Sequence, residues 1–120
     1  AEEIKTVPQE IRDSFFQATQ VSGKQRWQVS EQLTRLITFK RLNLVEYPYP
    51  LRGPTDIIFC RNVMIYFDTE TRQKIIDQFS RILAPNGYLF ISHSESLLGI
   101  KHTFAKVGNS VFQKQAPGVE

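Results

Sequence analysis

The sequence of 120 residues contains one cysteine, Cys60, so a single chain cannot form an internal disulfide. It also lacks an apolar run long enough to span a bilayer and the charged-then-apolar start that is typical of signal peptides. These absences exclude a disulfide-stabilised secreted scaffold and direct insertion into a membrane. We therefore expect a soluble protein in a reducing compartment, the cytoplasm.

Charge of one sign is not concentrated anywhere in the sequence. The 15 basic and 12 acidic residues give a formal net charge of +3, and the basic residues are scattered along the chain. Nucleic-acid binding needs clustered basic residues, so we expect no nucleic-acid partner. The two histidines, His93 and His102, lack further ligands at metal-binding spacing, so we expect no metal site.

The segment TDIIFCRNVMIYF at residues 55–67 is the most informative part of the chain. Residues 56–60 place apolar side chains on both faces, which is typical of a parallel strand covered by helices on both sides. The strand ends on Arg61 and Asn62, and Tyr66 follows one turn later. Because ligands of open α/β sheets bind beyond the carboxyl ends of the strands, this end predicts a binding or catalytic edge.

Other patterns in the first half predict four short elements. We expect a helix from Pro8 to about residue 20, a short strand at residues 27–29 and a capped helical turn at residues 30–33. Alternating apolar and polar residues at 37–42 predict an edge strand.

The second half predicts a helix between two parallel strands. Asp68 caps the helix, and its apolar stripe is formed by Ile75, Ile76, Phe79, Ile82 and Leu83. A strand at residues 88–91 then lies parallel to residues 56–60. Gly108-Asn109 predicts a terminal antiparallel hairpin. Together these elements predict an α/β fold with a mostly parallel sheet that ends in an antiparallel hairpin.

Three stretches carry a resemblance to a known family: Asn43-Leu44, residues 56–67, and LAPNGYLFISHSES at residues 83–96. In order and spacing, residues 27–113 resemble the chemotaxis receptor methyltransferases of the CheR type. The resemblance implies a Rossmann-like class I methyltransferase fold and S-adenosylmethionine as the cofactor. It also implies an enzyme that methylates glutamate side chains on the cytoplasmic domains of methyl-accepting chemotaxis receptors.

The chain also departs from the family pattern. Such enzymes begin with a helical domain, followed by a strand and a glycine-bearing loop that holds the cofactor, and the sequence contains neither. We therefore expect residues 1–120 to be the C-terminal half of a catalytic domain that lacks its first strands and is inactive alone. The strand at residues 56–60 would then expose a long apolar edge, through which we expect the chain to self-associate.

The resemblance also implies roles for individual residues. Asn43, Leu44 and Asn62 would contact the cofactor, with Leu44 packing on the adenine and Asn43 near its polar edge. Arg61 would also contact the cofactor and would lie with Tyr66 closest to the methyl group. An acceptor carboxylate is already ionised at neutral pH, so the reaction needs alignment and the exclusion of water rather than a general base.

Each of these residues also has a purely structural interpretation. Arg61 would then pair with Asp56 or Asp68, and Asn43 would cap a turn. Tyr66 would be an ordinary core aromatic. If these interpretations hold, the chain is a non-catalytic signalling or binding module of the same fold.

Two further features favour structural roles. Cys60 closes an apolar strand and is expected to be a buried small hydrophobe rather than a catalytic thiol. His93, Ser94 and Glu95 superficially suggest a hydrolytic set, but contiguous residues rarely converge as a triad does. We expect this segment to form or cap a turn.

Overall fold

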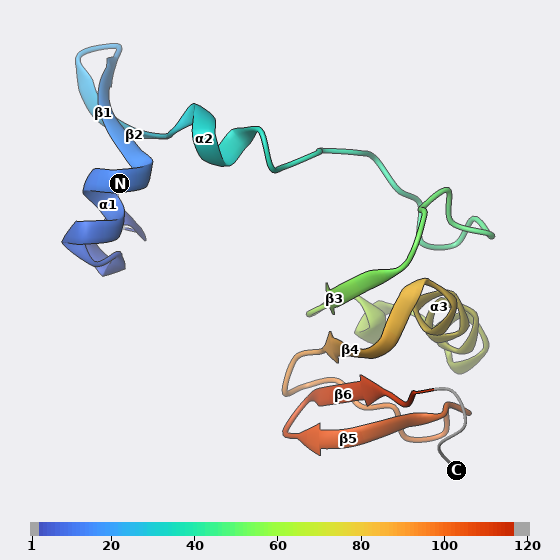
Figure 1. Cartoon of the computed structure of the whole chain (residues 1–120). Helices are drawn as coiled ribbons and strands as arrows, with labels where there is room; N and C mark the ends of the chain where they lie inside the picture. The colour runs from blue at the N-terminus through green and yellow to red at the C-terminus, as the bar shows by residue number, and fades with distance from the viewer. Residues whose placement is uncertain (1–2, 117–120) are drawn as a thin grey trace. The chain divides into compact units, whose positions relative to one another are not determined.

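The computed structural model describes residues 3–116. The chain divides into two compact units, Ala1–Arg41 and Leu42–Glu120. The α-helices and β-strands of each unit are labelled in Figure 1. The second unit contains every residue of the predicted site, so its layers decide how that site is built.

The first unit contains a short 3₁₀ turn, η1 (Glu3–Thr6), and a helix, α1 (Gln9–Phe15). The helix begins directly after Pro8 as predicted, but its extension to residue 20 is wrong, because strand β1 (Phe16–Val21) follows at once. This strand forms an antiparallel hairpin with β2 (Lys24–Val29), which contains the predicted strand at Trp27 and Val29. Ser22 and Gly23 have positive φ angles of 54° and 75°, the conformation that tight hairpin turns require.

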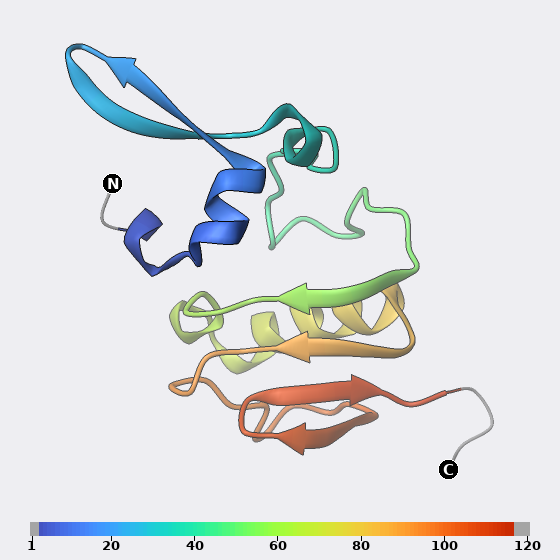
Figure 2. The same ribbon diagram turned by 60° about the vertical axis from the view of Figure 1, so that its left-hand side comes forward.

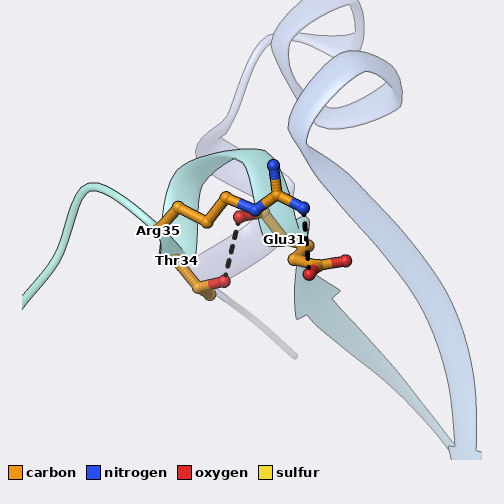
Figure 3. A network of polar contacts seen from close by, with 3 residues as sticks. All are labelled: Glu31, Thr34 and Arg35. Carbon is orange, nitrogen blue, oxygen red and sulfur yellow. Dashed lines mark hydrogen bonds and ion pairs between the residues drawn. The ribbon is translucent and has the colours of Figure 1, made fainter.

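Helix α2 (Glu31–Thr34) is the predicted helical turn. The side chain of Ser30 makes no capping hydrogen bond, contrary to the capping prediction. Figure 3 shows what stabilises the turn: Arg35 Nη2 lies 3.2 Å from Glu31 Oε1, and Thr34 Oγ1 donates to the Glu31 carbonyl. Both charged side chains are exposed, so this ion pair contributes only about 0.3–0.5 kcal/mol.

The predicted edge strand at residues 37–42 is wrong. These residues have no regular secondary structure, and Phe39 in their middle is almost fully exposed. A strand is stabilised by hydrogen bonds to a neighbour. No strand pairs with residues 37–42 in the described part of the chain, so alternation alone does not produce a strand here.

The predicted central helix is confirmed as α3 (Thr69–Ile82) in the second unit. Asp68 caps it by accepting a hydrogen bond of 2.8 Å from the backbone N–H of Thr71, which lowers the pKa of the Asp68 carboxyl. The predicted stripe is buried, with Ile75, Ile76, Phe79 and Ile82 on the helix and Leu83 at the start of the next strand. Sequence periodicity and one capping residue therefore place this helix correctly.

The second unit contains a four-stranded sheet of order β3-β4-β6-β5 (Figure 2). Its strands are β3 (Thr55–Phe59), β4 (Leu83–Phe90), β5 (Phe104–Gly108) and β6 (Val111–Lys114). The parallel pairing of β3 with β4 and the terminal hairpin are confirmed. The sheet is mixed: β6 enters between β4 and β5 and pairs antiparallel with both, so β3, β4 and β5 run in one direction and β6 alone runs against them, as expected for a mostly parallel sheet that ends in an antiparallel hairpin.

Strand β3 is not buried on both faces as predicted. Ile58 packs against the core on the face that α3 covers. Ile57 and Phe59 point to the other face and are 49% and 68% exposed. Figure 2 shows α3 behind β3 and β4, on one side of the sheet. Within the described residues, β3 therefore has apolar side chains on both faces but is covered by a helix on one face only.

Candidate functional site

The carboxyl end of β3 opens on a cavity of about 380 Å³ that contains two of the predicted cofactor residues. Leu44 and Arg61 both line it, although they are far apart in the sequence. The rest of the lining is mostly apolar and consists of Leu42, Tyr49, Leu51, Thr55, Ile58, Phe59, Cys60, Val63, Phe79 and Ile82. An apolar cavity of this volume with one charged group at its wall has the character of a small-molecule site.

Asn43, next to Leu44, forms a local turn. Its side-chain oxygen accepts a hydrogen bond of 3.1 Å from the backbone N–H of Val45, and its amide nitrogen donates to Glu46. The turn-capping interpretation therefore describes the contacts of Asn43. The exposed Asn43–Glu46 contact leaves the amide at the surface beside Leu44.

Tyr49 holds this segment in place and was not predicted as part of the site. Its hydroxyl donates a hydrogen bond of 2.7 Å to the carbonyl of Leu44, and its backbone N–H donates to Gln78 on α3. Burial of Tyr49 raises the pKa of its hydroxyl above its usual value, so the group stays protonated and donates. Tyr49 thus fixes Leu44 at the wall of the cavity.

Arg61 is exposed and forms no ion pair with Asp56 or Asp68, the partners of its structural interpretation, within residues 3–116. It also lines a second cavity of about 190 Å³, together with His93, Asn109 and Ser110. The guanidinium therefore has access to an apolar cavity and to a more polar one. Its five N–H donors suit it to bind a carboxylate at either place.

The other predicted residues lie on the loop that follows β3. Asn62 is exposed and has a φ angle of 61°, a left-handed conformation that asparagine tolerates better than most residues. Tyr66 ends the 3₁₀ turn η2 (Met64–Tyr66), is 80% exposed and does not line the larger cavity. The core-aromatic interpretation of Tyr66 is therefore wrong, while Met64 in the same turn is buried.

Cys60 has the structural role that its position predicts. The residue is buried, and burial together with the nearby charge of Glu95 raises the pKa of the thiol to about 11. At neutral pH the sulfur is almost entirely protonated and is a poor nucleophile. Cys60 therefore serves as an apolar part of the cavity wall.

Glu95 is buried, with 8% of its surface exposed, and it binds the backbone of the loop that follows β3. Burial raises the pKa of its carboxyl, but hydrogen bonds from Ser92 and from the loop backbone outweigh this effect and lower the pKa. The turn-capping interpretation of residues 93–95 is confirmed by the hydrogen bond from the backbone N–H of Ser92 to Glu95. The reach of Glu95 across to the loop was not predicted.

The protein-family model described as "CheR methyltransferase, SAM binding domain" matches residues 1–112. The chain belongs to this family. Its predicted resemblance is thus confirmed, and the cofactor named in the family description is S-adenosylmethionine.

Curated relatives agree with the family match. A probable chemotaxis protein methyltransferase of Rhizobium etli is 38% identical over 117 residues, which cover 97% of this chain and 43% of the relative. The chemotaxis protein methyltransferase of Escherichia coli K12 is 40% identical over 113 residues, covering 92% of this chain and 39% of the relative. The chain thus spans about two fifths of the length of these relatives.

Two features are absent from the part of the chain that the structure describes: a membrane-spanning helix and a cluster of metal-binding side chains. Within residues 3–116, no helix has the length and apolar character needed to cross a bilayer. The same residues contain no group of three or more histidine, cysteine, aspartate or glutamate side chains that could hold a metal ion.

Proposed function

We propose that this chain forms the cofactor- and acceptor-binding part of a methyltransferase that esterifies glutamate side chains on the cytoplasmic domains of chemotaxis receptors. The observation that carries the proposal is the cavity at the end of β3, because it brings Leu44 and Arg61 together at the edge where α/β sheets bind ligands. Membership of the family supports the cofactor assignment. The proposal places the enzyme in the cytoplasm.

The lining of the larger cavity fits the cofactor in chemical terms. Leu44 and its apolar neighbours offer a surface on which an adenine ring packs, and Asn43 lies beside it with an exposed amide. Arg61 offers a bidentate partner for a carboxylate, which both the cofactor and the acceptor glutamate carry. Bound S-adenosylmethionine would supply an electrophilic methyl group on its sulfonium sulfur.

The residues of the chain then act by alignment. The acceptor carboxylate is already ionised, so no side chain needs to remove a proton. Arg61 and the hydroxyl of Tyr66 orient the acceptor oxygen for in-line attack, and Asn62 contributes a further polar contact with the cofactor. The apolar wall keeps water, the competing nucleophile, out of the site.

The activity is proposed for the longer protein. We propose that residues 1–120 supply the C-terminal half of a Rossmann-like catalytic domain, and that turnover also needs the part of the family's length that this chain does not span. We therefore expect the isolated chain to be inactive.

Calorimetry with S-adenosylhomocysteine, the product form of the cofactor, tests the proposal. The full-length protein is expected to bind this ligand and to transfer methyl groups to a receptor fragment that contains its acceptor glutamates. The same titration on the 120-residue chain measures how much of the site the chain supplies. The alternative of a non-catalytic module predicts no binding by either protein, and that result would overturn the proposal.

We also propose that the isolated chain self-associates through β3. Within residues 3–116 this strand has one neighbour, β4, and its side chains Ile57 and Phe59 are largely exposed. A free apolar edge templates pairing with another chain.

Light scattering at rising concentration is expected to show dimers or larger species of the chain. Ile57→Lys should return it to a monomer, because a charge on an edge strand opposes pairing. Leu98→Lys is the matched control, since Leu98 is also exposed but lies outside the sheet. A monodisperse monomer of the unmodified chain at high concentration would contradict the idea.

A further inference from the structure

The carboxylate of Glu95 accepts five hydrogen bonds, and three come from consecutive backbone N–H groups of the loop that follows β3. Oε1 accepts from the backbone of Asn62 at 2.9 Å. Oε2 accepts from the backbone of Val63 at 3.2 Å and of Met64 at 2.8 Å. Ser92 completes the set, donating to Oε1 from its backbone at 3.0 Å and from its hydroxyl at 2.8 Å.

These contacts hold the loop in a conformation that it would not favour alone. Asn62 has a left-handed backbone with φ of 61°, a conformation that is unfavourable even for a tolerant residue. Successive N–H groups that converge on one point form a concave anion site, and here a side chain of the protein occupies it. The bound carboxylate therefore offsets the strain and fixes the backbone between Arg61 and Tyr66.

Glu95 can fix the loop because its own segment is held by neighbouring elements. Arg72 on α3 donates to the carbonyl of Ser96. On the other side, the hydroxyl of Ser110 donates to the carbonyl of Ser92 at 3.2 Å, and Ile91 donates to the carbonyl of Ser110 at 2.9 Å. Through its carboxylate, Glu95 therefore links the loop after β3 to a segment that α3 and the β5–β6 hairpin hold in place.

We propose that Glu95 is a positioning residue for methyl transfer. It does not touch the acceptor or the cofactor in this role, but it fixes the peptide units from 62 to 64 and so the directions in which Arg61 and Tyr66 leave the backbone. The inference rests on the proposed function, since it assigns a task to Glu95 within that same site.

The arrangement requires a carboxylate rather than any polar group of similar shape. Both oxygens face at least two donors. In Glu95→Gln the amide nitrogen must replace one oxygen, and in either orientation its N–H groups point at two backbone N–H groups. A buried donor that faces other donors is destabilising, so the loop is expected to move away.

The first test uses the full-length protein at a temperature where circular dichroism shows that each variant is folded. Glu95→Gln is expected to lower kcat about 10- to 100-fold, because supporting residues that orient a site have effects of this size. KM for the cofactor should rise by a smaller factor than kcat falls, since the loop carries Asn62 and Arg61 while Leu44 and Tyr49 are held independently of Glu95. Glu70→Gln, at an exposed position on α3, is the matched control.

A kcat equal to that of the wild type in folded Glu95→Gln would overturn the inference. If this variant does not fold, Glu95→Asp replaces it. The shorter side chain keeps the charge but cannot reach Ser92 and the loop together, so its kcat should also fall. An inactive wild type would contradict the proposed function instead, and the second test does not depend on activity.

The second test follows the backbone amide resonances of Asn62, Val63 and Met64 in the 120-residue chain during an acid titration. The carboxylate of Glu95 has a lowered pKa in the folded chain, so all three resonances should shift together below the usual glutamate value of about 4.3. Glu95→Gln should abolish this shared transition. Independent shifts of the three amides in the wild type would overturn the inference.

Discussion

Arg61→Ala in the full-length protein is expected to lower methyl transfer by about 100-fold or more, while circular dichroism and the midpoint of thermal unfolding stay those of the wild type. Arg61 lines both cavities at the end of β3. Removing one preorganised hydrogen-bond donor from a reacting centre costs about 10²–10³ in rate in other enzymes. Stability should change little, because Arg61 is exposed and has no ion pair within the described residues.

Two further variants make the result specific. Arg61→Lys should also be strongly impaired, because a single ammonium group cannot replace the bidentate fork of a guanidinium. Arg52→Ala removes an exposed arginine of the same unit that does not line the cavity, and it should retain wild-type activity. Wild-type turnover in Arg61→Ala would refute the assigned role.

The same variant decides which carboxylate Arg61 binds. If the guanidinium holds the carboxylate of the cofactor, Arg61→Ala should weaken the binding of S-adenosylhomocysteine by calorimetry. If it holds the acceptor glutamate, cofactor affinity should persist while kcat falls and KM for the receptor rises. The second cavity, with His93, Asn109 and Ser110 in its lining, gives a place for the second alternative.

Elements with strong local signals were predicted well. Helix α3 has both a capping residue at Asp68 and a buried stripe at helical spacing, and each signal is contained within the segment itself. The parallel pairing of β3 with β4 follows from the helix between them, because a crossover connection brings two strands side by side in the same direction. The terminal hairpin has its signal in its own turn, although the turn residues are Asn109 and Ser110, one position later than expected.

Predictions failed where another segment decides the structure. Residues 16–20 have a plausible helical pattern, but pairing with β2 makes them a strand. Residues 37–42 have the pattern of a strand but no partner within the described residues. In both cases a neighbour, rather than local preference, sets the backbone conformation.

The site was predictable in part for the same reason. The sequence predicts that Arg61 lies at the end of β3, because the apolar run stops there. Its proximity to Leu44 was predicted only from the family resemblance. Glu95 reaches loop residues that are 31 to 33 positions away in the sequence. Tyr49 bonds to Gln78, 29 positions away. No local pattern encodes such contacts; the one sequence signal is a glutamate between serines directly after an apolar strand.

Leu89→Ala is expected to lower the free energy of unfolding of the chain by about 2–5 kcal/mol, the range for leucine truncation in a packed core. Leu89 is fully buried, at 0% exposure, near the carboxyl end of β4. It is paired with Ile58 on β3 and Phe112 on β6, on the face that α3 covers. Truncation of this side chain leaves a cavity among buried neighbours of the core cluster.

Leu98→Ala is the matched control, because it removes the same atoms from a side chain that is 86% exposed, and its effect should be within about 0.5 kcal/mol. Denaturant unfolding at one fixed protein concentration measures both variants, since self-association would otherwise contribute to the apparent stability. Equal losses in the two variants would mean that the core does not lie between α3 and the sheet. Within the described residues, β3 pairs only with β4. A loss of stability in Leu89→Ala but not in Leu98→Ala would therefore show that the strand end carrying Arg61 depends on this core.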